Sequence, residues 1–202
     1  MASPRTNTRH FGVALRAMLV LTVALGLAYP LVVTAIGQTA IPGQANGSLL
    51  RQGGHVVGSA LIGQSFTDST GAPHPGWFQP RPSAAGTGYD AAASGGSNQG
   101  PENPALVSEI VRQKRAIADF NAVAPDRIPA DALTRSASGL DPDISPAYAR
   151  LQVTRVAAAR HVAVAEVRRL VESRIAAREL GYLGEPTVNV LELNLALAGL
   201  KG

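Results

Sequence analysis

The chain has 202 residues, of which 46% are hydrophobic, and it contains 21 glycines, 14 prolines and no cysteine. This composition is too apolar for a disordered protein and too irregular for a helical bundle, and it excludes disulfides and thiolate metal sites. The excess of positive charge is N-terminal: without Arg5, Arg9 and Arg16, the 18 basic residues fall to 15 against 14 acidic ones. A nucleic-acid-binding protein would carry its excess charge on the folded domain, so no nucleic acid is expected as a partner.

The first element is a long apolar run. From Ala17 to Gly37 the only ionisable side chain is that of Tyr29, and about 20 apolar residues suffice to cross a bilayer. We predict a transmembrane helix over residues 11–38, bent at Pro30, in a lipid bilayer. A cleaved signal peptide is the alternative, but its apolar core is usually only about 7–15 residues long.

The flanking charges predict the orientation of this helix. Positively charged flanks stay in the cytoplasm, so residues 1–10 form a cytoplasmic basic tail and the rest of the chain lies outside the bacterial inner membrane. The span contains no Asp, Glu, Lys or His, the residues that usually mark an ion or proton pathway. The chain alone is therefore not expected to be a transporter, although it can be part of one.

The remainder predicts one α+β domain over residues 55–202, with helices in its second half. Residues 39–54 contain Pro42 and glycines without periodicity, which indicates a connecting stretch. His55 to Ile62 is apolar and rich in valine, which predicts a strand. Residues 63–100 are rich in Gly, Pro and Ser, and a loop of this length is commonly a binding loop.

Helix starts are marked by capping side chains. Asn103 and Ser145 are each followed by proline, which favours the first helical position. Asn189, with Glu192 three positions later, resembles a capping box, and Pro186 to Val190 can form a short strand. The apolar residues predicted to face the core are Leu106, Ile110, Ile117, Phe120, Tyr148, Leu151, Val156, Ala159, Val164, Val167, Val171, Ile175, Leu193 and Leu197.

The run YDAAASGGSNQG, residues 89–100, invites comparison with a phosphate-binding loop. Gly95 and Gly100 have the required spacing, but Pro101 and Glu102 stand where Lys and Ser or Thr are needed. Proline removes a backbone N–H and glutamate repels an anion, so a phosphate cradle is excluded.

Other chemistry is weakly marked. The histidines are too far apart in sequence to suggest a metal site, and none is expected. A serine hydrolase using Ser94 or Ser97 remains an alternative, although no nucleophile-elbow motif is present. Trp77 and Phe78 lie between prolines, with Arg81 close by, and such side chains form either a small core or an anchor for a partner protein.

Four stretches carry a resemblance to a known family. They are GSALIGQSF with PGWFQPRPSA, then YDAAASGGSNQGPENP, then SASGLDPDISP with LQVTRVAAAR, and finally GEPTVNVLELNLAL. In this order, over nearly the whole chain, they resemble the C subunit of the Kdp potassium-transporting P-type ATPase. The chain departs from the family at Asp90, where asparagine is frequent, and at Gln79, where histidine is common.

The resemblance implies an accessory, non-hydrolysing subunit of a potassium import complex. Its partners would be a channel-like potassium-binding subunit, an ATP-hydrolysing P-type subunit and a small single-span subunit. ATP and K⁺ would be handled by the complex, and the C subunit would stabilise it and act as a catalytic chaperone that raises the apparent ATP affinity of the pump subunit.

The resemblance links Gln152 with nucleotide contact. An outer domain cannot touch cytoplasmic ATP, however, and a polar residue on a helix surface is the competing interpretation. The two Gly- and Pro-rich loops are predicted to contact partner proteins through Trp77, Phe78, Arg81, Tyr89, Gly95, Gly96 and Asn98.

Overall fold

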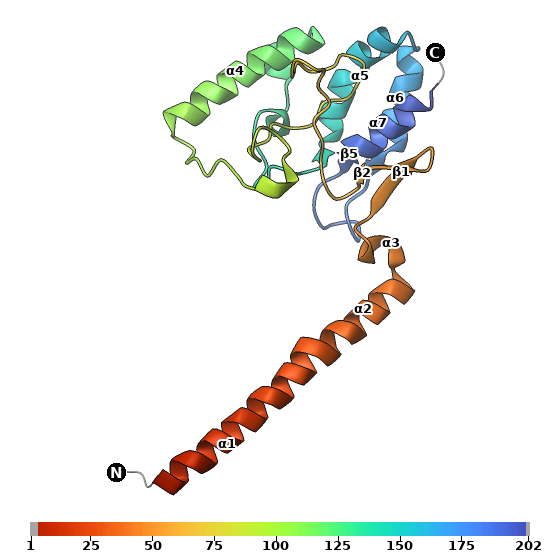
Figure 1. Cartoon of the computed structure of the whole chain (residues 1–202). Coiled ribbons are helices and arrows are strands. Elements are labelled where there is room, and N and C mark those ends of the chain that lie inside the picture. The colour runs from red at the N-terminus through yellow and green to blue at the C-terminus, as the bar shows by residue number, and fades with distance from the viewer. Residues whose placement is uncertain (1–3, 201–202) are drawn as a thin grey trace. The chain divides into compact units, whose positions relative to one another are not determined.

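The computed structural model describes residues 4–200, and the described chain separates into two compact units after Ser48 (Figure 1). Residues 1–3 of the predicted tail and 201–202 of the predicted outer domain lie outside the described residues. The first unit contains α1 (Pro4–Leu21), η1 (Thr22–Ala28), α2 (Tyr29–Ala40) and α3 (Pro42–Ala45). The helices of the second unit are η2 (Ala91–Ala93), α4 (Pro104–Asn121), η3 (Pro125–Arg127), η4 (Ala130–Ala132), α5 (Pro146–Arg160), α6 (Val164–Ser173) and α7 (Val190–Ala198). Its strands are β1 (Leu49–Gln52), β2 (His55–Ser59), β3 (Asp143–Ile144), β4 (Ile175–Ala176) and β5 (Thr187–Asn189).

The first unit is dominated by one continuous helix. Thr8–Ala40 is long and apolar enough to cross a membrane, and its most apolar window is not buried in the described chain. The helix begins at Pro4, so residues 4–10 of the predicted tail continue it instead of forming a separate segment.

A π-helix, η1, lies just before Pro30, where a bend is predicted. Proline has no N–H, so the carbonyl of Gly26, four residues earlier, cannot receive the usual helical hydrogen bond. The backbone widens over η1, and the N–H of Tyr29 bonds to the carbonyl of Ala24, five residues back. Insertions of this kind are a recognised way for a helix to absorb a local conflict.

The connecting stretch is shorter than predicted, because α3 and β1 both form within residues 39–54. β1 pairs with β2 as an antiparallel hairpin across Gly53 and Gly54. Both glycines have positive φ, as a two-residue hairpin turn with the twist of the strands requires. The strand predicted over 55–62 is confirmed in its first part and ends at Ser59.

The three predicted helix caps are confirmed. Asn103 accepts from the N–H of Ala105, Ser145 from that of Tyr148, and Asn189 from that of Glu192. The short strand predicted before α7 is β5, the central strand of an antiparallel sheet with the order β3-β5-β4.

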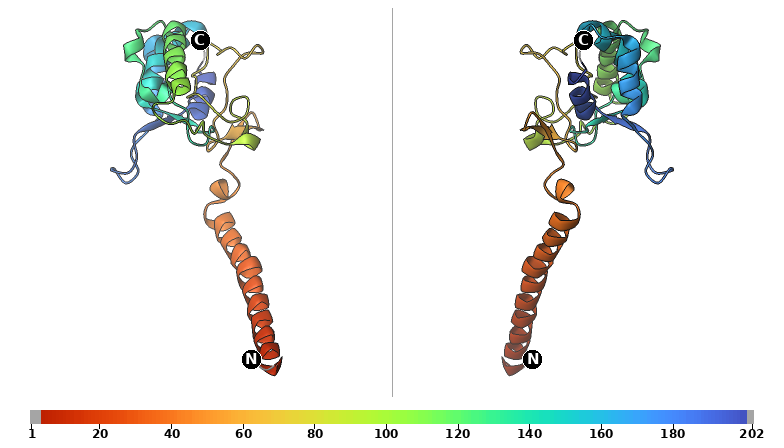
Figure 2. Two further views of the ribbon diagram at one scale, coloured as in Figure 1. Left: turned by 90° about the vertical axis from the view of Figure 1, so that its left-hand side faces the viewer. Right: turned by 90° about the vertical axis from the view of Figure 1, so that its right-hand side faces the viewer.

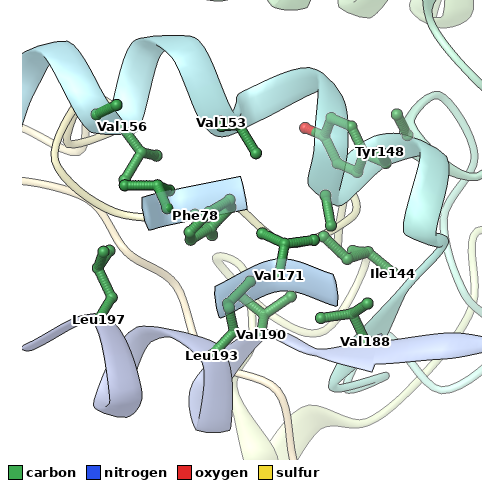
Figure 3. Packing of buried hydrophobic residues seen from close by; sticks show 14 of the residues in the cluster. Phe78, Ile144, Tyr148, Val153, Val156, Val171, Val188, Val190, Leu193 and Leu197 are labelled. Carbon is green, nitrogen blue, oxygen red and sulfur yellow. The ribbon is translucent and has the colours of Figure 1, made fainter. Parts of the chain in front are cut away.

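The core lies between α5, α6, α7 and the three-stranded sheet. Figure 3 shows Phe78 between α5 and α7, facing Val153 and Val156 on one side and Leu193 and Leu197 on the other. The buried hydrophobic cluster comprises Phe78, Ala118, Ile128, Ala132, Ile144, Tyr148, Ala149, Val153, Val156, Ala157, Val167, Val171, Val188, Val190, Leu193 and Leu197.

Six core predictions need correction. Leu106, Ile110 and Phe120 of α4 are partly buried, but they belong neither to the core cluster nor to the side chains packed against it. Ala159 is exposed, because the buried face of α5 contains Val153 and Ala157. Val164 is also exposed, since it is the first residue of α6 and precedes the part of this helix that packs on the core. Ile175 packs against the core, but from β4, since α6 ends at Ser173.

Candidate functional site

The long loop between β2 and α4 contains both stretches predicted to bind partners. Here the proline loop means residues 75–83 and the glycine loop means residues 89–104. Apart from η2, no helix or strand forms in residues 60–103 of the described chain. The position of these loops is therefore fixed by side chains and by other loops.

Two buried side-chain amides hold the backbone of the proline loop. Gln152 of α5 accepts from the N–H of Gln79 at 2.7 Å and donates to its carbonyl at 3.0 Å. Asn194 of α7 likewise accepts from the N–H of Phe78 at 2.9 Å and donates to its carbonyl at 3.0 Å. Each amide satisfies one donor and one acceptor that have no partner in a helix or sheet. We call this arrangement the amide clamp.

The burial of the clamp corrects two predictions. Gln152 is 0% exposed, so it is not a surface residue of its helix. Phe78 is also 0% exposed and belongs to the core, so its side chain is not available to a partner in this structure. The interpretation of the Trp-Phe pair as a core is right for Phe78.

Arg155 extends the clamp from the next turn of α5. It donates to Gln152 Oε1 at 2.7 Å, to the carbonyl of Trp77 at 3.0 Å and also to that of Pro75. Its guanidinium lies 4.4 Å from the ring centroid of Phe120, and burial lowers its pKa to about 10. A charged donor with several acceptors makes this the strongest set of hydrogen bonds to the loop.

Trp77 lies at the edge of the core and is only partly buried. The Arg160 guanidinium covers its ring at 3.9 Å from the centroid, and Phe66 lies 6.2 Å away, tilted by 40°. Arg160 also donates to the carbonyl of Gly76 at 2.7 Å. The ring therefore has a fixed position, and its role as a partner anchor stays a prediction.

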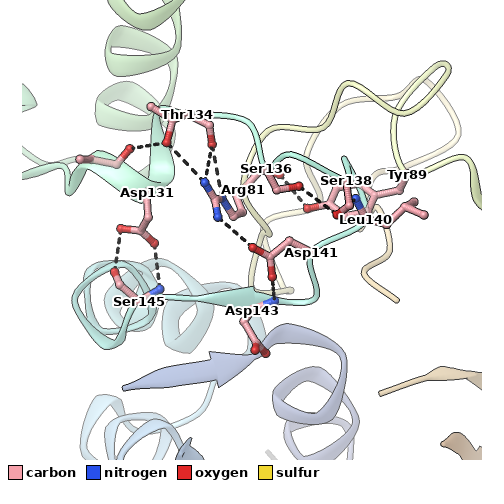
Figure 4. A network of polar contacts seen from close by, with 11 residues as sticks. Arg81, Tyr89, Asp131, Thr134, Ser136, Ser138, Leu140, Asp141, Asp143 and Ser145 are labelled. Atoms are coloured by element: carbon pink, nitrogen blue, oxygen red, sulfur yellow. Dashed lines mark hydrogen bonds and ion pairs between the residues drawn. The ribbon is translucent and has the colours of Figure 1, made fainter. Parts of the chain in front are cut away.

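Arg81 is used inside the chain (Figure 4). It pairs with Asp141 at 2.8 Å and donates to the carbonyl of Thr134 at 3.2 and 3.3 Å. The hydroxyl of Tyr89 donates to the carbonyl of Arg81 at 2.8 Å, and burial raises the pKa of that hydroxyl. These contacts join the proline loop, the start of the glycine loop and the segment before α5.

The glycine loop packs on residues 136–141. The N–H of Gly95 and the hydroxyl of Ser94 both donate to the carbonyl of Ser138 at 2.9 Å. A Cβ on Gly96 would lie 2.9 Å from the carbonyl oxygen of Ala137, so only glycine allows this approach. Asn98 is exposed and has φ of +51°.

A cleft of about 250 Å³ lies beside the two loops. Most of its wall is apolar and comes from prolines of the proline loop and from one face of α4. Burial raises the pKa of the Tyr148 hydroxyl in this wall to about 12. The lining residues include Gln79, Pro80, Pro82, Tyr89, Gln113, Ile117, Phe120 and Tyr148.

The geometry offers no support for the hydrolase alternative. Ser94 is bonded to a carbonyl, and Nδ1 of His74 accepts from the N–H of Gly76 at 3.1 Å. Residues 4–200 contain no group of three or more His, Cys, Asp or Glu side chains placed to hold a metal ion. The hydrogen bond of Ser94 is therefore made to a backbone carbonyl and not to a histidine or a carboxylate.

Asp143 gives the site a pH dependence. Burial raises the pKa of its carboxyl, the Asp141 carboxylate raises it further, and a hydrogen bond from Thr187 opposes both effects. A raised pKa means that the contribution of Asp143 to stability is full below the ordinary aspartate pKa and is lost as the pH rises through the raised value. We expect the variant Asp143→Asn to gain stability relative to the parent as the pH rises from about 4 to 7. Urea unfolding at several pH values checks this, and a difference that does not change with pH would contradict it.

Several residues of the site were not predicted from the sequence. Asn194 is the single amide in the otherwise apolar end of α7, and this was the available signal for a buried polar contact. Gln79 was noted only as a departure from the family, and its Nε2 donates to three carbonyls, those of Phe66, His74 and Trp77. Arg155 had no sequence signal, because arginines are frequent on the exposed faces of helices.

Comparisons with known proteins bear on the whole chain. A model of the family KdpC, described as the c chain of the K⁺-transporting ATPase, matches residues 11–199. The chain is 53% identical over 190 residues to the potassium-transporting ATPase KdpC subunit of Caulobacter vibrioides, which covers 93% of this chain and 92% of the relative. The corresponding protein of Beijerinckia indica is 51% identical over 189 residues, or 94% and 93% of the two chains. That of Acidobacterium capsulatum is 48% identical over 188 residues, or 93% and 97%.

These matches confirm the resemblance carried by the four motifs and give no support to the hydrolase. They span the apolar helix and the second unit together, and nearly the full length of each relative. The chain therefore belongs to the KdpC family of K⁺-transporting ATPase subunits.

Proposed function

We propose that the chain is an accessory, non-hydrolysing subunit of a high-affinity, ATP-driven potassium import complex. The observation that carries the proposal is the family match over residues 11–199, which includes both the membrane-span candidate and the folded unit. The partners are a channel-like potassium-binding subunit, a P-type subunit that hydrolyses ATP, and a small single-span subunit.

The helix Thr8–Ala40 anchors the subunit in the bacterial inner membrane with its N-terminus in the cytoplasm. The positive N-terminal flank supports this orientation, since Arg9 and Arg16 lie at the same end of the apolar run as Arg5. The second unit then lies outside the membrane, where it holds the complex together through the proline and glycine loops.

In this arrangement the subunit raises the apparent ATP affinity of the pump subunit indirectly. Both amide atoms of Gln152 are bonded inside the domain, and the side chain is fully buried. A nucleotide could reach this amide only if the clamp opened. Indirect action means that the subunit stabilises the pump conformation that binds ATP better, as linkage between two sites requires.

Purification in mild detergent tests the proposal. The unmodified full chain is expected to be recovered with larger membrane proteins that hydrolyse ATP in a potassium-dependent manner. A lone monomer that turns over ester or peptide substrates would contradict the proposal.

The loop variants Trp77→Ala and Gly96→Val are expected to reduce recovery with the partners about tenfold, as loss of an interface hot spot would. Potassium uptake at limiting potassium should fall with them. Valine at position 96 clashes with the backbone carbonyl of Ala137, so it is expected to separate the glycine loop from residues 136–141. Gly43→Val, outside both loops, is the control, because a Cβ at Gly43 has nothing within 4 Å.

The two roles of Trp77 are separated by measuring stability beside recovery. If Trp77→Ala unfolds at much lower urea while its folded fraction still assembles normally, the residue is a core element and not a partner anchor. Circular dichroism follows the unfolding of this variant, since it has lost the only tryptophan of the chain.

A further inference from the structure

A projecting loop between β4 and β5 is not used by the site described above. Residues 177–186, called the finger below, extend away from the rest of the second unit in both views of Figure 2. Every residue from 177 to 185 is exposed. Three large side chains lie at its tip, with Leu180 79% exposed, Tyr182 69% and Leu183 48%.

The finger has a defined backbone. Glu179 and Leu183 exchange both backbone hydrogen bonds, at 3.0 and 2.9 Å, and the N–H groups of Gly181 and Tyr182 donate to carbonyls within the same turn. The ion pair between Arg178 and Glu185 closes the base. The tip is therefore preorganised, and little freedom would remain to be lost on binding.

One residue of the tip has a strained backbone. Leu180 has φ of +52°, a left-handed conformation that a bulky side chain rarely adopts. Gly181 and Gly184 also have positive φ, and a Cβ on either would have no atom within 4 Å. Glycine is therefore favoured at these positions by the backbone conformation and not by lack of space. The turn directs apolar side chains outward at a conformational cost that no packing inside the chain offsets.

We propose that the finger inserts Leu180, Tyr182 and Leu183 into an apolar pocket, bordered by a basic group, on another subunit of the potassium-transporting complex. This inference rests on the proposed function. The size of the tip suits a pocket, and a buried aromatic anchor with its polar end at the rim is typical of interface hot spots.

The charges of the finger favour a protein over a lipid surface. Arg178 and Glu185 neutralise each other, and Glu179, next to Leu180, makes no ion pair with another described residue. The finger thus has one excess negative charge beside its tip. Helices that lie in a membrane interface are typically rich in Lys and Arg on their polar side instead. A basic group on the rim of the pocket would complement Glu179.

The absence of cysteine makes a direct test possible. Tyr182→Cys in the full chain is labelled with an environment-sensitive dye, and quenching by iodide is measured in the free chain and in the purified complex. Val107→Cys, at an exposed apolar position of α4, is the control. Quenching at position 182 is expected to fall severalfold on assembly.

A second measurement uses Leu180→Ser combined with Tyr182→Ser, against Val107→Ser. The double variant is expected to unfold at the parent's urea concentration, because both side chains are largely exposed in the second unit. Its recovery with the partner subunits should fall about tenfold. The labelling result stands by itself if the double variant fails to fold.

Each other outcome rejects the proposal in a distinct way. Unchanged quenching at position 182 in an intact complex rejects the finger contact and leaves the proposed function in place. Protection by vesicles of neutral and anionic phospholipid, without partner subunits, identifies a membrane surface as the occupant. Protection that grows with the concentration of the chain alone identifies a second copy. If the unmodified chain is not recovered with partner subunits, the proposed function and this inference fail together.

Discussion

Phe78→Ala is expected to lower the free energy of unfolding of the second unit by about 3–5 kcal/mol, the cost of truncating a fully buried aromatic side chain. Phe78 is 0% exposed and lies between α5 and α7. Both helices are held by further contacts, so the cavity left by the ring can close only in part. The loss combines the removed apolar contact with the cost of that cavity.

The measurement is urea unfolding of the full chain in detergent, followed by the fluorescence of Trp77. Trp77 is the only tryptophan and belongs to the second unit, so the long apolar helix of the first unit does not contribute to the signal. Val107→Ala, at a side chain 49% exposed, is the control and should change the free energy of unfolding by less than about 0.5 kcal/mol. A Phe78→Ala variant with parental stability that fails to join the complex would restore Phe78 as a partner contact.

Gln152→Leu is expected to cost at least about 2 kcal/mol of stability, since each buried backbone group left without a partner costs about 1–3 kcal/mol. Leucine has nearly the same volume, but it leaves both the N–H and the carbonyl of Gln79 unsatisfied. It also removes an acceptor from Arg155, whose pKa burial already lowers to about 10. The proline loop should then lose its fixed position beside α5.

The same unfolding measurement checks this expectation. Gln113→Leu, a glutamine of α4 that is only partly buried, is the matched control and should be nearly neutral. The nucleotide interpretation predicts the opposite pattern. In that case Gln152→Leu would unfold like the parent, while the assembled complex would need more ATP for half-maximal activity.

Local chemistry explains which elements could be predicted. Asn103, Ser145 and Asn189 each cap the backbone within three residues of their own position, so sequence patterns contain the whole interaction. The apolar run of the first unit is likewise recognisable from length and composition alone. β1 could not be predicted, because Leu49–Gln52 has no strand pattern of its own and forms a strand by pairing with β2.

The candidate site depends on long-range contacts. Gln152 and Gln79 are 73 residues apart, and Asn194 and Phe78 are 116 apart, so no local pattern links the members of the clamp. The helix-surface interpretation of Gln152, which follows from an outer domain that cannot touch cytoplasmic ATP, is wrong because the side chain is buried. Gln152 is buried because the proline loop is not part of a sheet, so its buried N–H and carbonyl groups need side chains as hydrogen-bond partners.

The glycine loop is an intermediate case. Its glycines are predicted to contact a partner protein, and in the structure Gly96 instead lies close to the backbone of Ala137. The sequence could not show that the approaching backbone belongs to the same chain. We therefore propose partner contact at the outer side of the loop, where Asn98 is exposed.

Contact between the outer side of these loops and the other subunits is tested most directly by amide hydrogen exchange. Exchange is compared between the full chain alone in detergent and the same chain in the purified complex. Slower exchange is expected at residues 97–100 in the complex, with no change in α5, whose amides are already bonded within the helix. Equal exchange of residues 97–100 in both states, in a complex that retains the subunit, would show that the loops make no such contact.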